Sequence, residues 1–171
     1  LISKTLNARD VGETEITTED GIEVFQNEKF YLLKKNVKIV SDNFTLSADE
    51  VKINFDKSLY DITELDAYSN VDFKSNEFET SGSGNYLNFK VKVEKIKVEG
   101  EGSQLVTSDI KMFSDGFIEV SNLNGDFLLK GTNSKLVNEN IIIKAETING
   151  KFSENNNEKE INFLEVIDKN I

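Results

Sequence analysis

The chain has 171 residues, enough for one domain with a buried core, and its 31 acidic and 20 basic side chains give a formal charge of −11. Phosphates are captured by Lys and Arg, so this acidity disfavours nucleic acid as a partner. Because His and Cys are both absent, the commonest general base, the thiol nucleophile and the usual zinc ligands are missing. We therefore expect no enzyme, no catalytic residue, no metal site and no cofactor.

Residues 1–15 are polar and aperiodic, which predicts a flexible lead-in. From Ile16 onward, apolar and polar residues alternate with the period of half-buried strands. No window shows a convincing helical period, so the chain is predicted to be all-β, with roughly 16 antiparallel strands. The predicted strands are residues 22–24, 30–32, 37–39, 44–48, 51–55, 71–73, 77–80, 86–93, 96–98, 110–113, 117–120, 127–130, 135–137, 141–145, 147–152 and 161–166.

Part of this pattern repeats. Residues 36–55 recur 34 positions later as residues 70–89, and a shorter copy lies at residues 141–152. The identical pairs are Asn36/Asn70, Val37/Val71, Ser41/Ser75, Phe44/Phe78, Ser47/Ser81, Asn54/Asn88 and Phe55/Phe89. A fixed period of this length indicates a repeated supersecondary unit. We therefore expect an elongated stack of hairpins rather than a compact enzyme.

Five segments need individual interpretation. In residues 58–67, apolar side chains three apart allow one helical turn, but the repeat favours a strand paired with the next unit. Residues 153–160 are predicted to be a solvated hairpin loop. The glycine-rich stretches at 82–84 and 100–102 lack the Lys-Ser/Thr of a phosphate loop and are predicted to be bulges or tight turns. Asn124-Gly125 predicts a hairpin turn rather than a calcium loop.

Closely spaced carboxylate pairs occur at Asp49/Glu50, Glu64/Asp66 and Glu99/Glu101. A glycosidase needs two carboxylates facing each other across a cleft. A chain this acidic produces such pairs on its surface by chance, so we assign them no catalytic role.

The alternating apolar residues form a continuous stripe, which allows two interpretations. It can be the packed core of an ordinary sandwich, or two sheets can splay and receive acyl chains between them. Periodicity does not separate the two. The candidate lipid-binding residues of the interior are Ile39, Phe44, Leu46, Val51, Ile53, Phe73, Phe78, Phe89, Ile118 and Phe127.

Two motifs carry a family resemblance. Asn36-Val37-x-Ile39, followed by the run Leu46-Ser47-Ala48-Asp49-Glu50-Val51, resembles the OstA-like family of lipopolysaccharide transport proteins. Residues 16–24 resemble the opening strand of that family and residues 161–166 its closing strand, so the resemblance covers roughly residues 16–168. The chain departs from the family at Lys35, where the family has Gly.

The resemblance implies one domain over residues 16–171, an elongated twisted antiparallel β-jellyroll. An LptA-like member binds the acyl chains of lipopolysaccharide in an apolar interior groove and forms part of a periplasmic bridge from inner to outer membrane. The implied partners are lipopolysaccharide and other β-jellyroll export components, joined end to end by strand pairing, with head-to-tail self-assembly. Any signal peptide or membrane anchor would lie outside this sequence. The implied docking edges contain Ile22, Val24, Phe163 and Val166.

Edge strands without Pro suit such pairing, since Pro is one of the devices that block strand addition. Two alternatives stay open. One is an LptC-like, membrane-anchored docking subunit of the same export system. The other is a structural β-solenoid that binds no lipid.

Overall fold

The computed structural model describes residues 11–156 and 158–168, and the described residues form 15 strands and no helix. All pairings are antiparallel, which confirms the all-β prediction. The strands are β1 (Glu15–Thr17), β2 (Ile22–Phe25), β3 (Phe30–Val40), β4 (Phe44–Phe55), β5 (Ile62–Ser75), β6 (Thr80–Lys90), β7 (Lys95–Glu99), β8 (Ser103–Thr107), β9 (Ile110–Ser114), β10 (Phe117–Ser121), β11 (Asp126–Lys130), β12 (Lys135–Asn138), β13 (Ile141–Lys144), β14 (Thr147–Asn155) and β15 (Glu158–Ile167).

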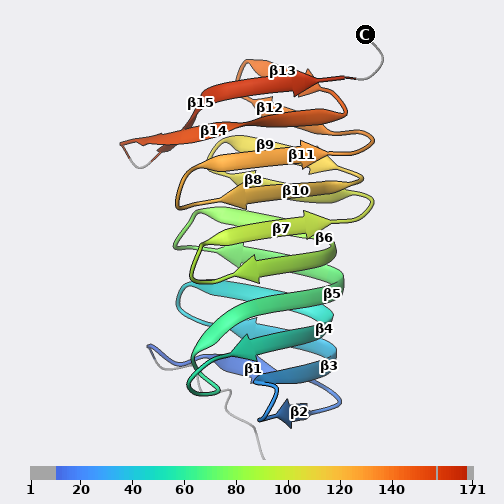
Figure 1. Cartoon of the computed structure of the whole chain (residues 1–171), viewed down its shortest axis with the longest axis vertical. Coiled ribbons are helices and arrows are strands. Elements are labelled where there is room, and N and C mark those ends of the chain that lie inside the picture. Colours follow the sequence, from blue (N-terminus) through green and yellow to red (C-terminus); the bar gives the residue numbers. More distant parts are fainter. Residues whose placement is uncertain (1–10, 157, 169–171) are drawn as a thin grey trace, which may run out of the picture.

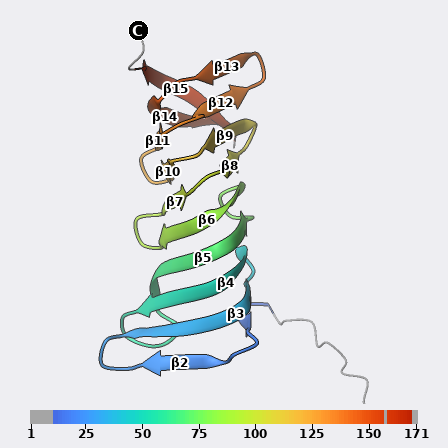
Figure 2. The ribbon, with the colours of Figure 1, turned by 90° about the vertical axis from the view of Figure 1, so that its right-hand side faces the viewer.

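One continuous sheet folds over itself into two layers, and the strands stack like rungs from β1 and β2 at one end to β13 and β15 at the other (Figure 1). The long strands β3 to β6 bend midway and contribute to both layers (Figure 2). Sheet I comprises β2, β7, β10, β11, β14, β15 and residues 30–34, 50–55, 62–68 and 86–90. Sheet II comprises β1, β8, β9, β12, β13 and residues 37–40, 44–48, 71–75 and 80–84. The chain therefore forms an elongated, twisted β-jellyroll.

Along one long side, which we call the corner side, the chain passes directly from one sheet to the other. At two of these bends Asn36 and Asn70 have φ angles of 50° and 52°, a left-handed conformation that Asn tolerates better than most residues. The Asn70 amide donates to Asp49 Oδ2 at 2.9 Å, and the Asn36 amide donates to Glu19 in the same way. The repeated asparagines therefore tie neighbouring bends together.

The opposite long side, the seam, carries the turns that keep the chain within one sheet. Here the repeated serines act on the backbone, because Ser41 Oγ accepts from the Phe44 N–H at 3.1 Å and Ser75 Oγ from the Phe78 N–H at 3.2 Å. No covalent crossing joins the two sheets at these turns. Only side-chain and backbone contacts hold the seam closed.

The space between the sheets is filled by a single hydrophobic cluster that runs from Tyr31 in β3 to Phe152 in β14. Its twelve largest fully buried side chains come from both sheets and from most strands: Leu33, Ile39, Leu46, Ile53, Leu65, Leu87, Ile96, Leu105, Ile110, Met112, Ile118 and Leu129. Each fully buried side chain of this size contributes about 1.5–3 kcal/mol. The alternation read from the sequence is therefore the inner face of both sheets.

Several predicted boundaries are wrong. Residues 76–79 form a turn rather than part of a strand, and β8 at residues 103–107 was not predicted. The predicted loop at 153–160 is mostly strand, since β14 extends to Asn155 and β15 begins at Glu158. The strand alternative for residues 58–67 is correct from Ile62 onward. Ile62 itself pairs with Phe55 of the preceding strand, whereas residues 64–67 also pair with β6, as predicted for the next unit.

The glycine-rich stretches behave differently from each other. Residues 82–84 lie inside β6, next to a register shift in its pairing with β5, and do not form a turn. Residues 100–102 do form a turn, with Gly100 and Gly102 at positive φ. Asn124-Gly125 is the predicted hairpin turn, with Gly125 at φ 80°. Among the described residues 15 strands are present rather than roughly 16, and residues 1–10 of the predicted lead-in lie outside the described residues.

Candidate functional site

The ten candidate interior residues lie between the two sheets, in or against the hydrophobic cluster. Eight are buried: Ile39, Leu46, Val51, Ile53, Phe73, Phe89, Ile118 and Phe127. The other two, Phe44 and Phe78, are partly buried at turns of the seam. The structure thus brings all ten together in one apolar layer. Ligand binding to that layer stays a prediction.

Aromatic rings concentrate beside the seam. Phe73 contacts Phe44 and Phe89, with ring centroids 6.1 and 6.0 Å apart. Further along the axis, Phe127 stacks on Phe152 at 4.4 Å. Aromatic contacts of this kind contribute about 0.5–1.5 kcal/mol beyond their buried area. The seam is therefore the aromatic margin of the interior, where the two sheets meet without a chain connection between them.

One polar cluster interrupts this margin. Thr80 and Thr107 are buried at the seam ends of β6 and β8, and their hydroxyl oxygens lie 3.2 Å apart. The Lys159 ammonium of β15 donates to Thr107 Oγ1 at 2.8 Å, to Asn122 Oδ1 at 3.0 Å and to the Phe78 carbonyl at 3.3 Å. Burial lowers the pKa of Lys159, although Glu154 and Glu79 oppose this shift. Sequence reasoning missed this lysine because its polar neighbours indicated a solvated loop.

The two ends of the molecule present strand edges. The predicted docking residues Ile22 and Val24 are exposed on β2, and Phe163 and Val166 are exposed on β15. Among the described strands β2 pairs only with β3, and β15 only with β14, so each ends sheet I. At the C-terminal end, Ile141 and Ile142 of β13 are exposed as well, which the sequence analysis did not single out for docking. A pocket of about 520 Å³ lies between β13 and β15 at this end.

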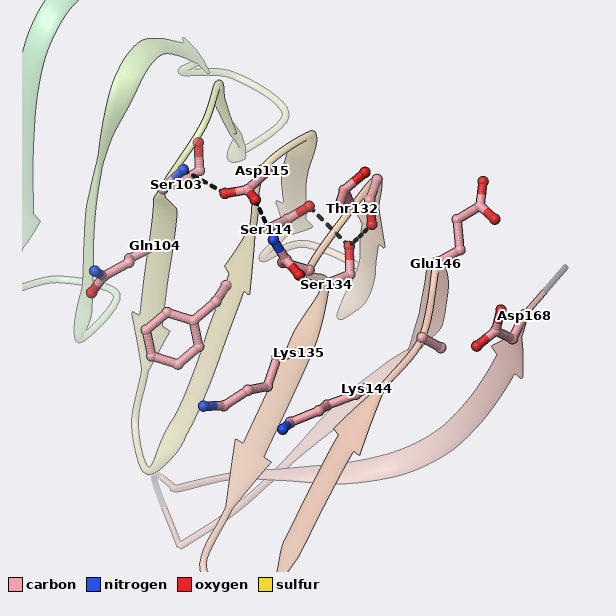
Figure 3. Close-up of a pocket in the computed structure, with 15 residues that line it drawn as sticks. Ser103, Gln104, Ser114, Asp115, Thr132, Ser134, Lys135, Lys144, Glu146 and Asp168 are labelled. Atoms are coloured by element: carbon pink, nitrogen blue, oxygen red, sulfur yellow. Dashed lines mark hydrogen bonds between the residues drawn. The ribbon is translucent and has the colours of Figure 1, made fainter. Parts of the chain in front are cut away.

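A larger pocket, of about 810 Å³, lies on the corner side of the C-terminal half, and no candidate interior residue lines it. Its floor is another bend-to-bend connection (Figure 3), in which Asp115 accepts from the Asn133 amide at 2.7 Å and from the Gly102 N–H at 2.8 Å. These hydrogen bonds lower the pKa of Asp115. Lys135 and Lys144 project side by side from paired positions of β12 and β13. The hydrogen bonds that connect neighbouring bends account for this pocket.

The carboxylate pairs noted in the sequence do not converge on a cleft. Asp66 and Glu64 lie on the outer face of sheet I, where both accept from the Asn88 amide and Asp66 also accepts from the Tyr86 hydroxyl. Burial, followed by the hydrogen bond to Asp66, raises the pKa of Tyr86. Within residues 11–156 and 158–168, no group of acidic residues could hold a metal ion, and no helix is long and apolar enough to cross a membrane.

Comparison with known proteins addresses the family directly. Residues 16–155 match the family described as LptA/(LptD N-terminal domain) LPS transport protein. Among solved structures the chain is similar to LptH from Pseudomonas aeruginosa, the LptA-homologous periplasmic component of the lipopolysaccharide transport device. The TM-score is 0.54 and the identity 10%, over 64% of this chain and 76% of that one. At this identity the likeness shows the fold alone. The comparison with curated proteins found no match. The family match spans most of the chain, and the protein therefore belongs to the LptA/(LptD N-terminal domain) family of lipopolysaccharide transport proteins.

Proposed function

We propose that this protein carries lipopolysaccharide through the periplasm, with the lipid's acyl chains held between the two sheets. The observation that carries the proposal is the unbroken apolar layer from Tyr31 to Phe152. Acyl chains transferred into such a layer gain about 0.8 kcal/mol per buried methylene, so carriage needs no chemistry. The family membership supports the same role.

In the structure the candidate residues pack against one another, so lipid entry requires the two sheets to move apart. The seam is where this costs least, because no backbone connection crosses it at the turns and Phe44 and Phe78 are only partly buried there. We therefore place the first contact with acyl chains at the aromatic margin, and the deeper residues Ile39, Leu46, Val51 and Ile53 along the path of a fully inserted chain.

Photocrosslinking tests the carrier function. A photoreactive phenylalanine analogue at Phe78 or Phe89 should crosslink to lipopolysaccharide. Phe117 provides the matched control, because it lies on the outer face of sheet I, with the Lys97 ammonium 4.6 Å from its ring centroid. Crosslinking from Phe117 as strong as that from Phe89 would contradict carriage in the interior.

A substitution tests the same point independently. Phe78→Glu places a carboxylate at the margin of the apolar layer, where a charge is costly to bury beside acyl chains. Because Phe78 lies in a turn and is partly buried, the β fold should survive, as circular dichroism would show. Crosslinking from Phe89 should then be lost. If crosslinking from Phe89 is unchanged in the folded variant, the carrier function is wrong, and a structural β-solenoid that binds no lipid is favoured.

We further propose that the ends join to other β-jellyroll export components, or to copies of this chain, through β2 and β15. The exposed apolar residues Val24 on one edge and Phe163 on the other support this, since unpaired edges are templates for strand addition. Val24→Lys should weaken self-association in sedimentation measurements, because an edge lysine blocks pairing. Equal association of the variant and the parent protein would exclude β2 as a docking edge. An LptC-like docking role would use the same edges with a different partner.

A further inference from the structure

Among the hairpins of the described chain, only the one formed by β14 and β15 has a tip that reaches from sheet I across the seam to sheet II. The pairing shifts register between Lys151 and Phe152, and residues 153–155 and 158–160 continue beyond this shift toward the seam. There the Lys159 N–H approaches Ser108 Oγ of the β8–β9 turn at 3.4 Å.

The Lys159 ammonium completes the crossing. Two of its three acceptors, the Phe78 carbonyl and Thr107 Oγ1, belong to sheet II, and the third, Asn122 Oδ1, belongs to a turn of sheet I. No salt bridge within 4.0 Å joins Lys159 to a carboxylate of the described residues. Even a half-buried ammonium is costly unless its protons are donated, and here three neutral acceptors from both sheets receive them.

We infer that the β14–β15 tip is a latch across the seam, in which Lys159 is the positioning residue that decides whether acyl chains can enter the interior from the side. The inference rests on the proposed carrier function. Two pockets flank Lys159, of about 380 and 280 Å³, so the tip is not packed solidly around it. Detaching the ammonium removes the hydrogen bonds to the Phe78 carbonyl and to Thr107 Oγ1, and leaves only the long one from the Lys159 N–H to Ser108 Oγ, at 3.4 Å, between the described tip residues and sheet II. The aromatic margin on either side can then part.

The latch can be released and locked in separate variants. Lys159→Met keeps the apolar stem and removes the donors, whereas Lys151→Met is the matched control, since Lys151 lies exposed on the same hairpin and pairs with Asp126. The chain contains no Cys, so the double variant Ser108→Cys/Lys159→Cys can form only one intramolecular disulfide. In its reduced form the double variant lacks the ammonium, so the latch is released. In its oxidised form the disulfide ties the hairpin tip to sheet II, so the latch is locked.

Hydrogen exchange measures the latch without lipid. In Lys159→Met, amides of residues 76–80, 105–109 and 158–161 should exchange at least roughly fivefold faster than in the parent protein, because local opening exposes them. Lys151→Met should exchange as the parent does. Oxidation of the double variant should slow the same amides relative to its reduced form. Unchanged exchange in Lys159→Met would overturn the inference whether or not the disulfide forms.

Lipopolysaccharide crosslinking from position 89 then connects the latch to transport. The rate should be highest in Lys159→Met and in the reduced double variant, and lowest in the oxidised form. Equal rates in all forms would show that the tip controls no lipid and would overturn the inference. If no form crosslinks, the parent included, while exchange responds as expected, the latch stands and the carrier function fails.

Discussion

Gly84 offers a sharp test of how closely the two sheets approach at the bend of β6. A Cβ at this position would lie 2.6 Å from Val98 Cγ1, 3.0 Å from Ser103 Oγ and 3.4 Å from the Glu99 carbonyl oxygen. The first distance is far inside van der Waals contact, and Val98 is fully buried in β7. Gly84→Ala therefore requires β6 and β7 to separate or Val98 to change rotamer.

Overpacking of this kind costs about 1–3 kcal/mol. For a chain of this length each kcal/mol lowers Tm by about 2–4 °C, so the expected decrease in Tm is roughly 2–12 °C in thermal unfolding followed by circular dichroism. Ser83→Ala is the control, because Ser83 is the next residue along β6, is not buried, and should change stability by less than about 0.5 kcal/mol.

A double-mutant cycle identifies the cause of the destabilisation. If the Val98 side chain is the obstacle, Gly84→Ala combined with Val98→Ala should be less destabilised than the sum of the single variants, with a coupling of about 0.5–3 kcal/mol. An unchanged Tm in Gly84→Ala would refute the close approach. Strictly additive effects would show that the obstacle is Ser103 or the Glu99 carbonyl rather than Val98.

Three further predictions concern other residues that stabilise the two sheets. Asn70→Ala should cost about 1–3 kcal/mol in urea unfolding, because it removes the hydrogen bond to Asp49 and places Ala at φ 52°, whereas Asn70→Gly should recover the conformational part only. Ile118→Ala should cost about 2–5 kcal/mol, since Ile118 is fully buried in β10, and a smaller loss would indicate that the interior collapses around the missing side chain. Burial raises the pKa of Tyr31 to about 12. The protonated Tyr31 hydroxyl therefore contributes its full stabilisation below pH 10, and this contribution is lost as the pH rises toward about 12. The free energy of unfolding of Tyr31→Phe should therefore fall less over that pH range than that of the parent protein.

The sequence predicted the class of the fold well because alternation records which residues face inward. It predicted ends of strands less well, for a physical reason visible at residues 76–79 and 153–160. In the first segment Phe78 looks like part of a strand, but the Ser75 hydroxyl captures the Phe78 N–H and makes a turn. In the second, polar residues continue as strand because residues 153–155 of β14 pair with residues 158–160 of β15, and Lys159 finds acceptors on sheet II.

The candidate interior was also predictable as a layer, although its packed state was not. Period-2 alternation reports that Leu46 and Ile53 share a face, but it carries no information on the distance between the two sheets. That distance depends on close approaches such as the one between Gly84 and Val98, and on contacts far apart in the chain, such as Lys159 with Phe78. Neither the close approach nor the long-range contact changes the period-2 pattern of the sequence, so the pattern predicts neither.

The repeat itself now has a physical meaning that is distinct from lipid binding. Of its identical pairs, Asn36/Asn70 fastens bends and Ser41/Ser75 shapes seam turns, as Asn70 with Asp49 and Ser75 with Phe78 show. These are devices for building a stack of hairpins of any length. The proposed carriage of acyl chains requires the interior to open, and the seam is the side on which no chain connection joins the two sheets at the turns. It follows that the residue controlling opening should stand outside the repeat, as Lys159 does on the last hairpin.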